Sequence, residues 1–152
     1  MLFRSEVLWE AAQRAGPDGL PAPVASPPAG WGALDFNHAP SGWGRPSPVG
    51  VFSTAYGLAG QADGRGNVWE WCRNALPQGP QPYHRPGALN QAQADWDGSV
   101  DQAGIVRALR GGAYSLTASQ CRPSHRNHVH PGVRVNGFGV RLVRVWPPHS
   151  GH

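Results

Sequence analysis

The chain has 152 residues, only 14% of them charged, and it is rich in glycine (21), proline (16) and tryptophan (7). This length suits one domain with a single core, and the composition predicts turns and loops anchored by aromatic side chains rather than long helices. All thirteen basic residues are arginine, and the net charge of +4 contains no basic run, which argues against nucleic-acid binding.

The N-terminal segment predicts a helix that Ser5 caps and that runs to about Ala15, where Gly16-Pro17 stops it. Glu6 and Glu10 interrupt any hydrophobic core of a signal peptide, and no stretch approaches the ~20 apolar residues of a membrane span. A cytoplasmic location is therefore the default expectation.

The rest of the chain alternates between loops and short strands. Residues 18–48 predict ordered, irregular chain, because they are rich in proline, glycine and serine and still contain large aromatic residues. Residues 67–72 alternate as a strand, residues 105–109 predict a second strand that ends before Gly111-Gly112, and residues 138–146 predict a final, largely buried strand. The expected class is α+β, loop-rich, with few helices and a small antiparallel sheet.

Several segments, in this order, are similar to the formylglycine-generating enzyme (sulfatase-modifying factor) family: RSEVLWEAAQRAG, SPVGVFSTAYGL, GNVWEWC, RALRGGAYS, and CRPSHRN followed by GFGVRLVR. The resemblance implies a C-type lectin-like fold and a single domain over residues 1–152. It also implies that the N-terminal part of the usual domain is missing here. A fragment, or a partner chain that supplies the missing part, would explain this.

The resemblance also bears on catalysis. In this family a copper ion is held by two cysteines, which suit a soft ion, and the matching positions here are Ala118 and Pro123. We therefore expect that this chain binds no copper and that it is not an enzyme. The related iron-dependent sulfoxide synthases take their iron ligands largely from a separate helical domain. This sequence shows no such domain, so the resemblance does not favour that activity either. The resemblance leaves a structural Ca²⁺ ion, bound by oxygens near GNVWEW, as an open alternative.

Histidines offer another route to a metal. His125, His128 and His130 have H-x-x-H-x-H spacing, and Cys121 precedes His125 by four residues. Imidazole and thiolate together can bind Zn²⁺ or Cu²⁺, but a loop without helical or strand period does not preset their geometry. The favoured interpretation is a set of exposed loop histidines, with no metal site.

A second resemblance concerns residues 110–142. They are similar to the variable region of proteins diversified by retroelements, which use the same lectin-like scaffold and in which template-directed mutagenesis randomises selected codons. The side chains expected to be free to vary are Ser115, Leu116, Thr117, Ser119, His125, Asn127, His128, Val129, His130, Val133, Val135 and Asn136. The residues expected to form the scaffold between them are Asn67, Trp69, Trp71, Arg110, Gly111, Gly112, Arg122, Arg126 and Arg141.

Arginine can serve as such a scaffold because one guanidinium bridges several loop carbonyls that have no sheet partner. The leading hypothesis is thus a non-catalytic protein that binds a protein or cell-surface ligand through residues 115–136. One alternative is a metalloenzyme of the formylglycine-generating type, or a degenerate relative of it. Another is a sensor or accessory domain of a larger polypeptide.

Overall fold

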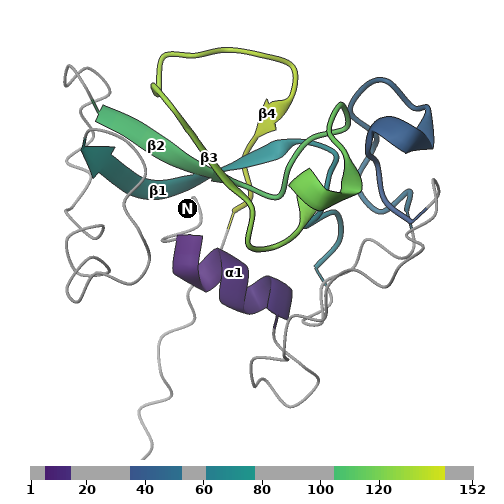
Figure 1. Ribbon diagram of the computed structural model, residues 1–152, viewed down its shortest axis with the longest axis horizontal. Coiled ribbons are helices and arrows are strands. Elements are labelled where there is room, and N and C mark those ends of the chain that lie inside the picture. Colours follow the sequence, from purple (N-terminus) through teal and green to yellow (C-terminus); the bar gives the residue numbers. More distant parts are fainter. Residues whose placement is uncertain (1–5, 15–34, 53–60, 78–104, 143–152) are drawn as a thin grey trace, which may run out of the picture.

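The computed structural model describes residues 6–14, 35–52, 61–77 and 105–142. Their elements, in chain order, are helix α1 (Glu6–Arg14), the 3-10 helix η1 (Ala39–Ser41), strands β1 (Trp69–Pro77) and β2 (Ile105–Arg110), the 3-10 helix η2 (Ala118–Cys121), and strands β3 (Arg126–Val129) and β4 (Phe138–Gly139). Figure 1 shows them as one small sheet with α1 packed on β1 and β2. The α+β, C-type lectin-like class expected from the sequence is confirmed.

The sheet has the order β3-β2-β1-β4. Strand β1 pairs antiparallel with β2, with an irregularity between Trp71 and Ala75, and β2 pairs antiparallel with β3. Strand β4 lies parallel to β1 and pairs through two residues only. The sheet is therefore mainly, but not purely, antiparallel.

Two of the strand predictions need correction. The final strand is short, because its parallel pairing ends at Gly139. Beyond it Val140 is 62% exposed and Leu142 is 72% exposed, so the expected burial is wrong for these two residues, whereas Arg141 between them is half-buried. Residues 143–146 lie outside the described part of the chain. The stretch between Gly112 and Phe138 also contains β3, although its sequence shows no strand period.

The two faces of the sheet pack differently. Trp9 of α1 packs on Cys72 and Ala108 on one face. Trp69 packs with Leu109 and Ala113 on the other face. A further cluster joins Phe36 and Phe52 to Cys121 at the end of η2. The connection that follows β2 is thereby fixed against the core, and the long loop that returns to β4 lies at the surface.

Candidate functional site

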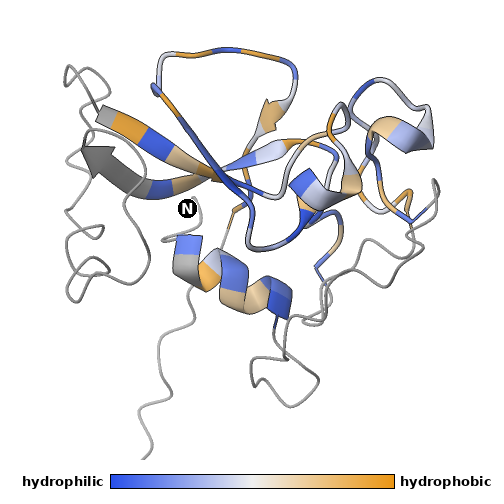
Figure 2. Cartoon of the chain, viewed as in Figure 1, coloured by the Kyte–Doolittle hydropathy of each residue, from blue (hydrophilic) through white to orange (hydrophobic). Residues whose placement is uncertain are grey.

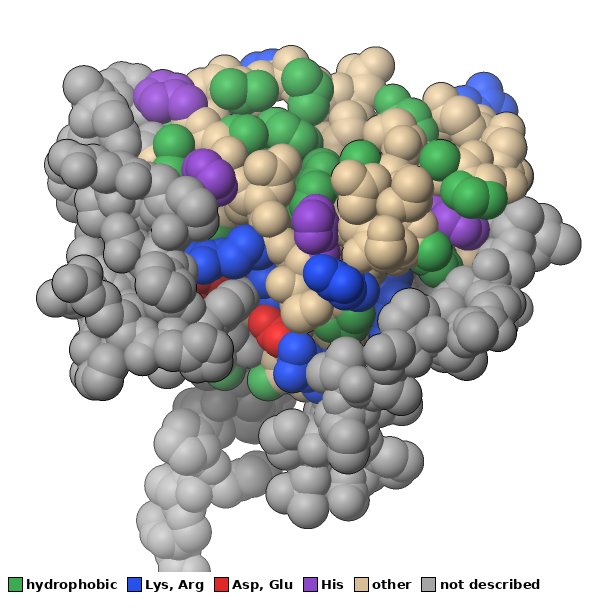
Figure 3. All heavy atoms as spheres, in the orientation of Figure 1, with side chains coloured by type: hydrophobic (Ala, Val, Ile, Leu, Met, Phe, Trp, Pro, Cys, Tyr) green, Lys and Arg blue, Asp and Glu red, His purple; other side chains and the backbone are tan. Residues whose placement is uncertain are grey.

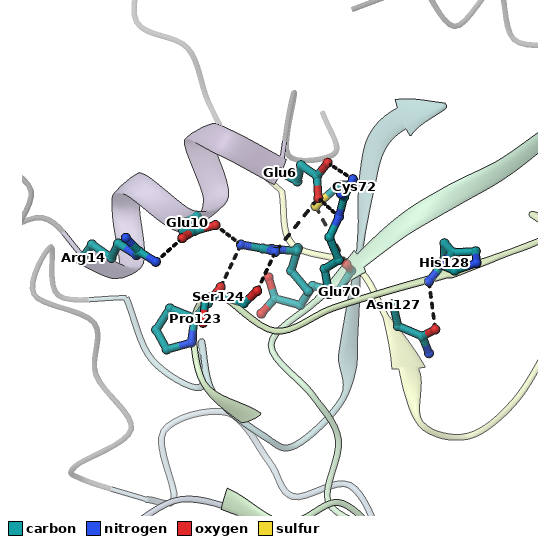
Figure 4. Close-up of polar contacts among 11 residues, drawn as sticks. Glu6, Glu10, Arg14, Glu70, Cys72, Pro123, Ser124, Asn127 and His128 are labelled. Carbon is teal, nitrogen blue, oxygen red and sulfur yellow. Dashed lines mark hydrogen bonds and ion pairs between the residues drawn. The ribbon is translucent and has the colours of Figure 1, made fainter. Parts of the chain in front are cut away.

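Arg110 joins three segments of the chain. Its side chain is fully buried and its Nη2 group donates to Glu10 of α1 and to the carbonyl oxygen of Pro123, at 2.7 Å for the latter. Its Nη1 group reaches the carbonyl oxygen of Ser124 at 3.5 Å. The guanidinium also lies 5.4 Å from the centre of the Trp9 ring (Figure 4). Arg110 thus holds the chain after η2 against α1.

Two more arginines pair with buried carboxylates. Arg126 donates to Glu6 of α1 at 2.5 and 3.0 Å, and Arg141 donates to Glu70 of β1 at 2.5 to 3.0 Å. Glu70 also accepts from the indole nitrogen of Trp9 at 2.7 Å. We call Arg110, Arg126 and Arg141 with Glu6, Glu10 and Glu70 the arginine–glutamate frame.

The sequence predicted that these arginines bind loop carbonyls and that Glu70 binds loop backbone, and it did not predict that the arginines pair with Glu6, Glu10 and Glu70. A signal was present, because residues 105–142 contain six arginines and no Asp or Glu. Buried guanidinium groups need anionic partners, so those partners had to come from elsewhere in the chain. Arg122, expected in the same scaffold, is exposed instead.

The remaining scaffold residues are mostly buried. Asn67 adopts the left-handed backbone conformation (φ 60°), and its side-chain Oδ1 accepts from the Ser47 backbone N–H at 2.8 Å. Gly111 and Gly112 also have positive φ values. Trp69 is buried, whereas Trp71 is half-buried and packs edge-to-face on Phe138 with ring centres 5.6 Å apart.

The structure separates the twelve side chains expected to form the binding surface. Seven are exposed: Ser115, Thr117, Ser119, His130, Val133, Val135 and Asn136. Leu116 and Val129 are half-buried and pack against the core. In β3 the register places His128 beside Ala108 on the α1 side of the sheet, and Asn127 beside Leu109 on the opposite side (Figure 4). The twelve therefore do not form one continuous face.

A groove of about 440 Å³ lies beside the loop that joins β3 to β4. Its lining residues are Trp71, Pro131, Val133, Arg134, Val135, Asn136, Phe138 and Val140. Sequence reasoning named Val133, Val135 and Asn136 as surface residues, took Trp71 for scaffold, and did not anticipate that Pro131, Arg134, Phe138 and Val140 join them. This volume is within the range of about 300–1,000 Å³ that is typical of ligand sites.

The histidines lie apart, as the space-filling view shows for this face of the molecule (Figure 3). His125 lies against Trp69, with ring centres 5.7 Å apart, while His128 lies on the α1 side of β3. Among the described residues, no three His, Cys, Asp or Glu side chains are placed to share a metal ion.

The residues around GNVWEW do not fit a Ca²⁺ ion through Asn67 or Glu70. The Oδ1 atom of Asn67 already accepts from Ser47 and from the Asn37 side chain. Both carboxylate oxygens of Glu70 accept from Arg141, and one accepts also from Trp9. These oxygens are engaged by donors, so a cation would first have to displace them.

His125 is expected to titrate below the ordinary histidine pKa of about 6.5. Burial lowers its pKa, and the nearby cations Arg122 and Arg110 lower it further. The unfolded chain then binds more protons than the folded chain near this pH, so stability falls as the pH drops through about 6.5. Nuclear magnetic resonance (NMR) titration of the His125 ring, assigned with a His125→Asn variant, tests this. A midpoint at or above 6.5 would contradict it.

Cys72 and Cys121 are buried free thiols. Burial raises the pKa of both, and that of Cys121 rises from 9.0 to about 12, which reduces its thiolate fraction at neutral pH about a thousandfold. We expect neither thiol to react rapidly with Ellman's reagent in the folded protein, and both to react in denaturant. Rapid stoichiometric labelling of the folded protein would contradict this prediction.

Among the described residues, none of the helices has the length and apolar character needed to cross a membrane.

Comparison with solved structures supports the fold. The chain resembles Treponema denticola variable protein 1, with a TM-score of 0.59, 20% sequence identity, and coverage of 90% of this chain and 45% of that one. Agreement at this level of identity concerns the fold.

Two relatives are enzymes by name. A hercynine oxygenase from Mycolicibacterium thermoresistibile is 36% identical over 100 residues, and one from Mycobacterium tuberculosis is 35% identical over 99 residues. Each match covers 65% of this chain, and the chain spans about a fifth (22%) of the length of each relative. The expectation that the chain is no enzyme is contradicted by these relatives. Its basis, Ala118 and Pro123 in place of two thiols, bears on a copper site alone.

The model of one family covers almost the whole chain. It is described as the sulfatase-modifying factor enzyme 1-like domain, and it matches residues 3–146. The described structure, with its small sheet, single α-helix and long connections, agrees with that assignment. The chain therefore belongs to the sulfatase-modifying factor enzyme 1-like domain family.

Proposed function

We propose that this domain binds a ligand through side chains of residues 115–136, and that these side chains are diversified as in retroelement variable proteins. The observation that carries the proposal is that one set of residues holds the backbone in place while a different set forms the surface. The arginine–glutamate frame fixes the chain before this region through Arg110, within it through Arg126, and after it through Arg141. Within the described residues, none of the twelve proposed surface side chains hydrogen-bonds to the frame.

Because the surface side chains do not bond to the arginine–glutamate frame, they can be substituted without breaking it. The polar contacts of Thr117 are with Ser119 and Gln120, and the Asn127 side chain accepts from the next backbone N–H. Exchanging such side chains removes local contacts and leaves the buried ion pairs intact. Surface changes of this kind usually alter stability by no more than about 0.5 kcal/mol. Leu116 and Val129 pack against the core, so we expect a narrower choice of residue there.

Sequencing the codons for residues 110–142 from independent isolates tests the proposal. Substitutions are expected to concentrate at the twelve positions and to coincide with adenines in a nearby near-copy of this DNA. The codons for Arg110, Arg126 and Arg141 are expected to stay constant. Substitutions spread evenly over the region, with no near-copy and no neighbouring reverse transcriptase, would overturn it.

The two hercynine oxygenases favour a second candidate, in which the domain is part of an enzyme of that kind. The complete gene product would then consume oxygen in a hercynine-dependent manner. Measuring oxygen uptake with hercynine and with histidine separates the candidates, since no hercynine-dependent uptake is expected from a ligand-binding protein alone.

A further inference from the structure

The groove beside Trp71 and Phe138 has a mixed apolar and polar wall. Trp71 and Phe138 contribute two aromatic rings that meet edge-to-face. Most of the other lining residues come from the loop from His130 to Gly137, in which Val133, Arg134, Val135 and Asn136 alternate between apolar and polar side chains (Figure 2). The apolar side chains of such a lining can enclose an apolar group, while the polar side chains can orient it.

Arg134 is the one charged side chain in this lining. Its Nη1 group donates to the carbonyl oxygens of Pro131 and Val133, at 2.6 and 3.2 Å, which holds the exposed guanidinium over its own loop. The described contacts leave its Nε and Nη2 groups unengaged. These two groups form the edge that binds a carboxylate in a bidentate manner.

Charge around the groove also favours an anion. Residues 105–142 contain no Asp or Glu, and the glutamates of the frame are engaged by Arg110, Arg126 and Arg141. In the described part of the chain, no hydrogen bond or ion pair joins Arg134 to a carboxylate.

The loop backbone offers donors as well. The N–H groups of Val133 and Phe138 bond within the loop, to His130 and Val135. In the described part of the chain no hydrogen bond engages the N–H groups of Arg134, Val135 or Asn136. Such groups pair with water or with a ligand, and a run of them suits an extended peptide backbone.

We propose that this groove binds a peptide segment in which an acidic side chain stands next to a large apolar one. The carboxylate pairs with Arg134, and the apolar side chain lies against Trp71 and Phe138. This inference rests on the proposed ligand-binding function and deepens it, because it names the class of ligand and the part of the surface that is used.

Titration of the ¹⁵N-labelled protein with the peptide acetyl-Gly-Asp-Phe-Gly-amide tests the proposal. We expect shifts of the Trp71 indole N–H, assigned by its loss in Trp71→Phe, and of the backbone amides of residues 133–138. Replacing Asp by Lys, or Phe by Ala, should weaken binding about tenfold or more, because each removes one of the two contacts. Arg134→Gln should weaken binding similarly, while Arg122→Gln, also an exposed arginine but outside the groove, should leave it unchanged.

The possible outcomes test the groove proposal separately from the proposed ligand-binding function of the domain. Equal binding of the Lys and Asp peptides would overturn the ligand class. Phenylacetate binding as tightly as the peptide would also overturn it, in favour of a small carboxylate. Shifts confined to residues 115–125 would overturn the groove as the site, yet leave ligand binding by the surface in place. Only the distribution of substitutions among isolates bears on diversification itself.

Discussion

Replacing Arg110 with methionine is expected to destabilise the protein by about 3–5 kcal/mol, the usual cost of breaking a buried ion pair by removing one partner. Methionine retains most of the length and apolar volume of arginine. It leaves Glu10 with the half-buried Arg14 as its remaining cation, and the carbonyl oxygen of Pro123 without its donor. Urea denaturation followed by tryptophan fluorescence measures the loss.

Arg122→Met is the matched control, because Arg122 is exposed and the described contacts do not include it in the frame. Its effect should remain within about 0.5 kcal/mol. The double variant Arg110→Met, Glu10→Met should recover part of the lost stability, since the Glu10 carboxylate that lost its buried partner is then removed as well. If Arg110→Met cost no more than the control, the frame would not be what holds residues 122–126 in place.

Gly112→Ala is expected to cost about 2–5 kcal/mol, from strain of the left-handed conformation combined with overpacking. Gly112 has a φ of 79°. A methyl group there would lie 2.6 Å from the sulfur of Cys121 and 2.9 Å from its Cα atom. Cys121 is fully buried against Phe36 and Phe52, so neither it nor the backbone of η2 has room to retreat.

Gly42→Ala is a close control for the cost of placing an alanine in the left-handed backbone conformation. Gly42 has a φ of 70°, and an added Cβ atom would meet no atom within 4 Å. The control should cost about 1–2 kcal/mol, and the excess in Gly112→Ala measures the contact with Cys121. Thermal unfolding of the two variants provides the comparison. Equal losses would mean that η2 can shift to accept the methyl group.

The elements with clear periodicity were predictable from sequence. The helix observed at Glu6–Arg14 and strand β2 followed from their apolar spacing and from glycines that end them. Strand β3 was not predictable in this way. Its inward residue Arg126 faces a glutamate rather than an apolar side chain, so the alternation of a half-buried strand is absent from its sequence.

The groove could be predicted only in part. Val133, Val135 and Asn136 were predicted as surface residues because the resemblance to retroelement variable proteins places them among the side chains free to vary. Trp71 stands about sixty residues earlier and was interpreted as scaffold, because alternation places it on the same strand face as Trp69 and both were expected in the core. Bringing Trp71 to the loop depends on the parallel pairing of β4 with β1, which no local pattern encodes.

The ion pairs of α1 also determine how late in synthesis this helix can make its tertiary contacts. Glu6 and Arg126 are 120 residues apart, and Glu10 and Arg110 are 100 apart. During synthesis from the N-terminus, the helix therefore emerges long before its partners, and the indole of Trp9 has no sheet to cover it until β1 and β2 have formed. Contacts this distant in sequence slow folding. Between the synthesis of residues 6–14 and that of β2, the nascent chain thus carries the Trp9 side chain uncovered, and a chaperone could bind it in that interval.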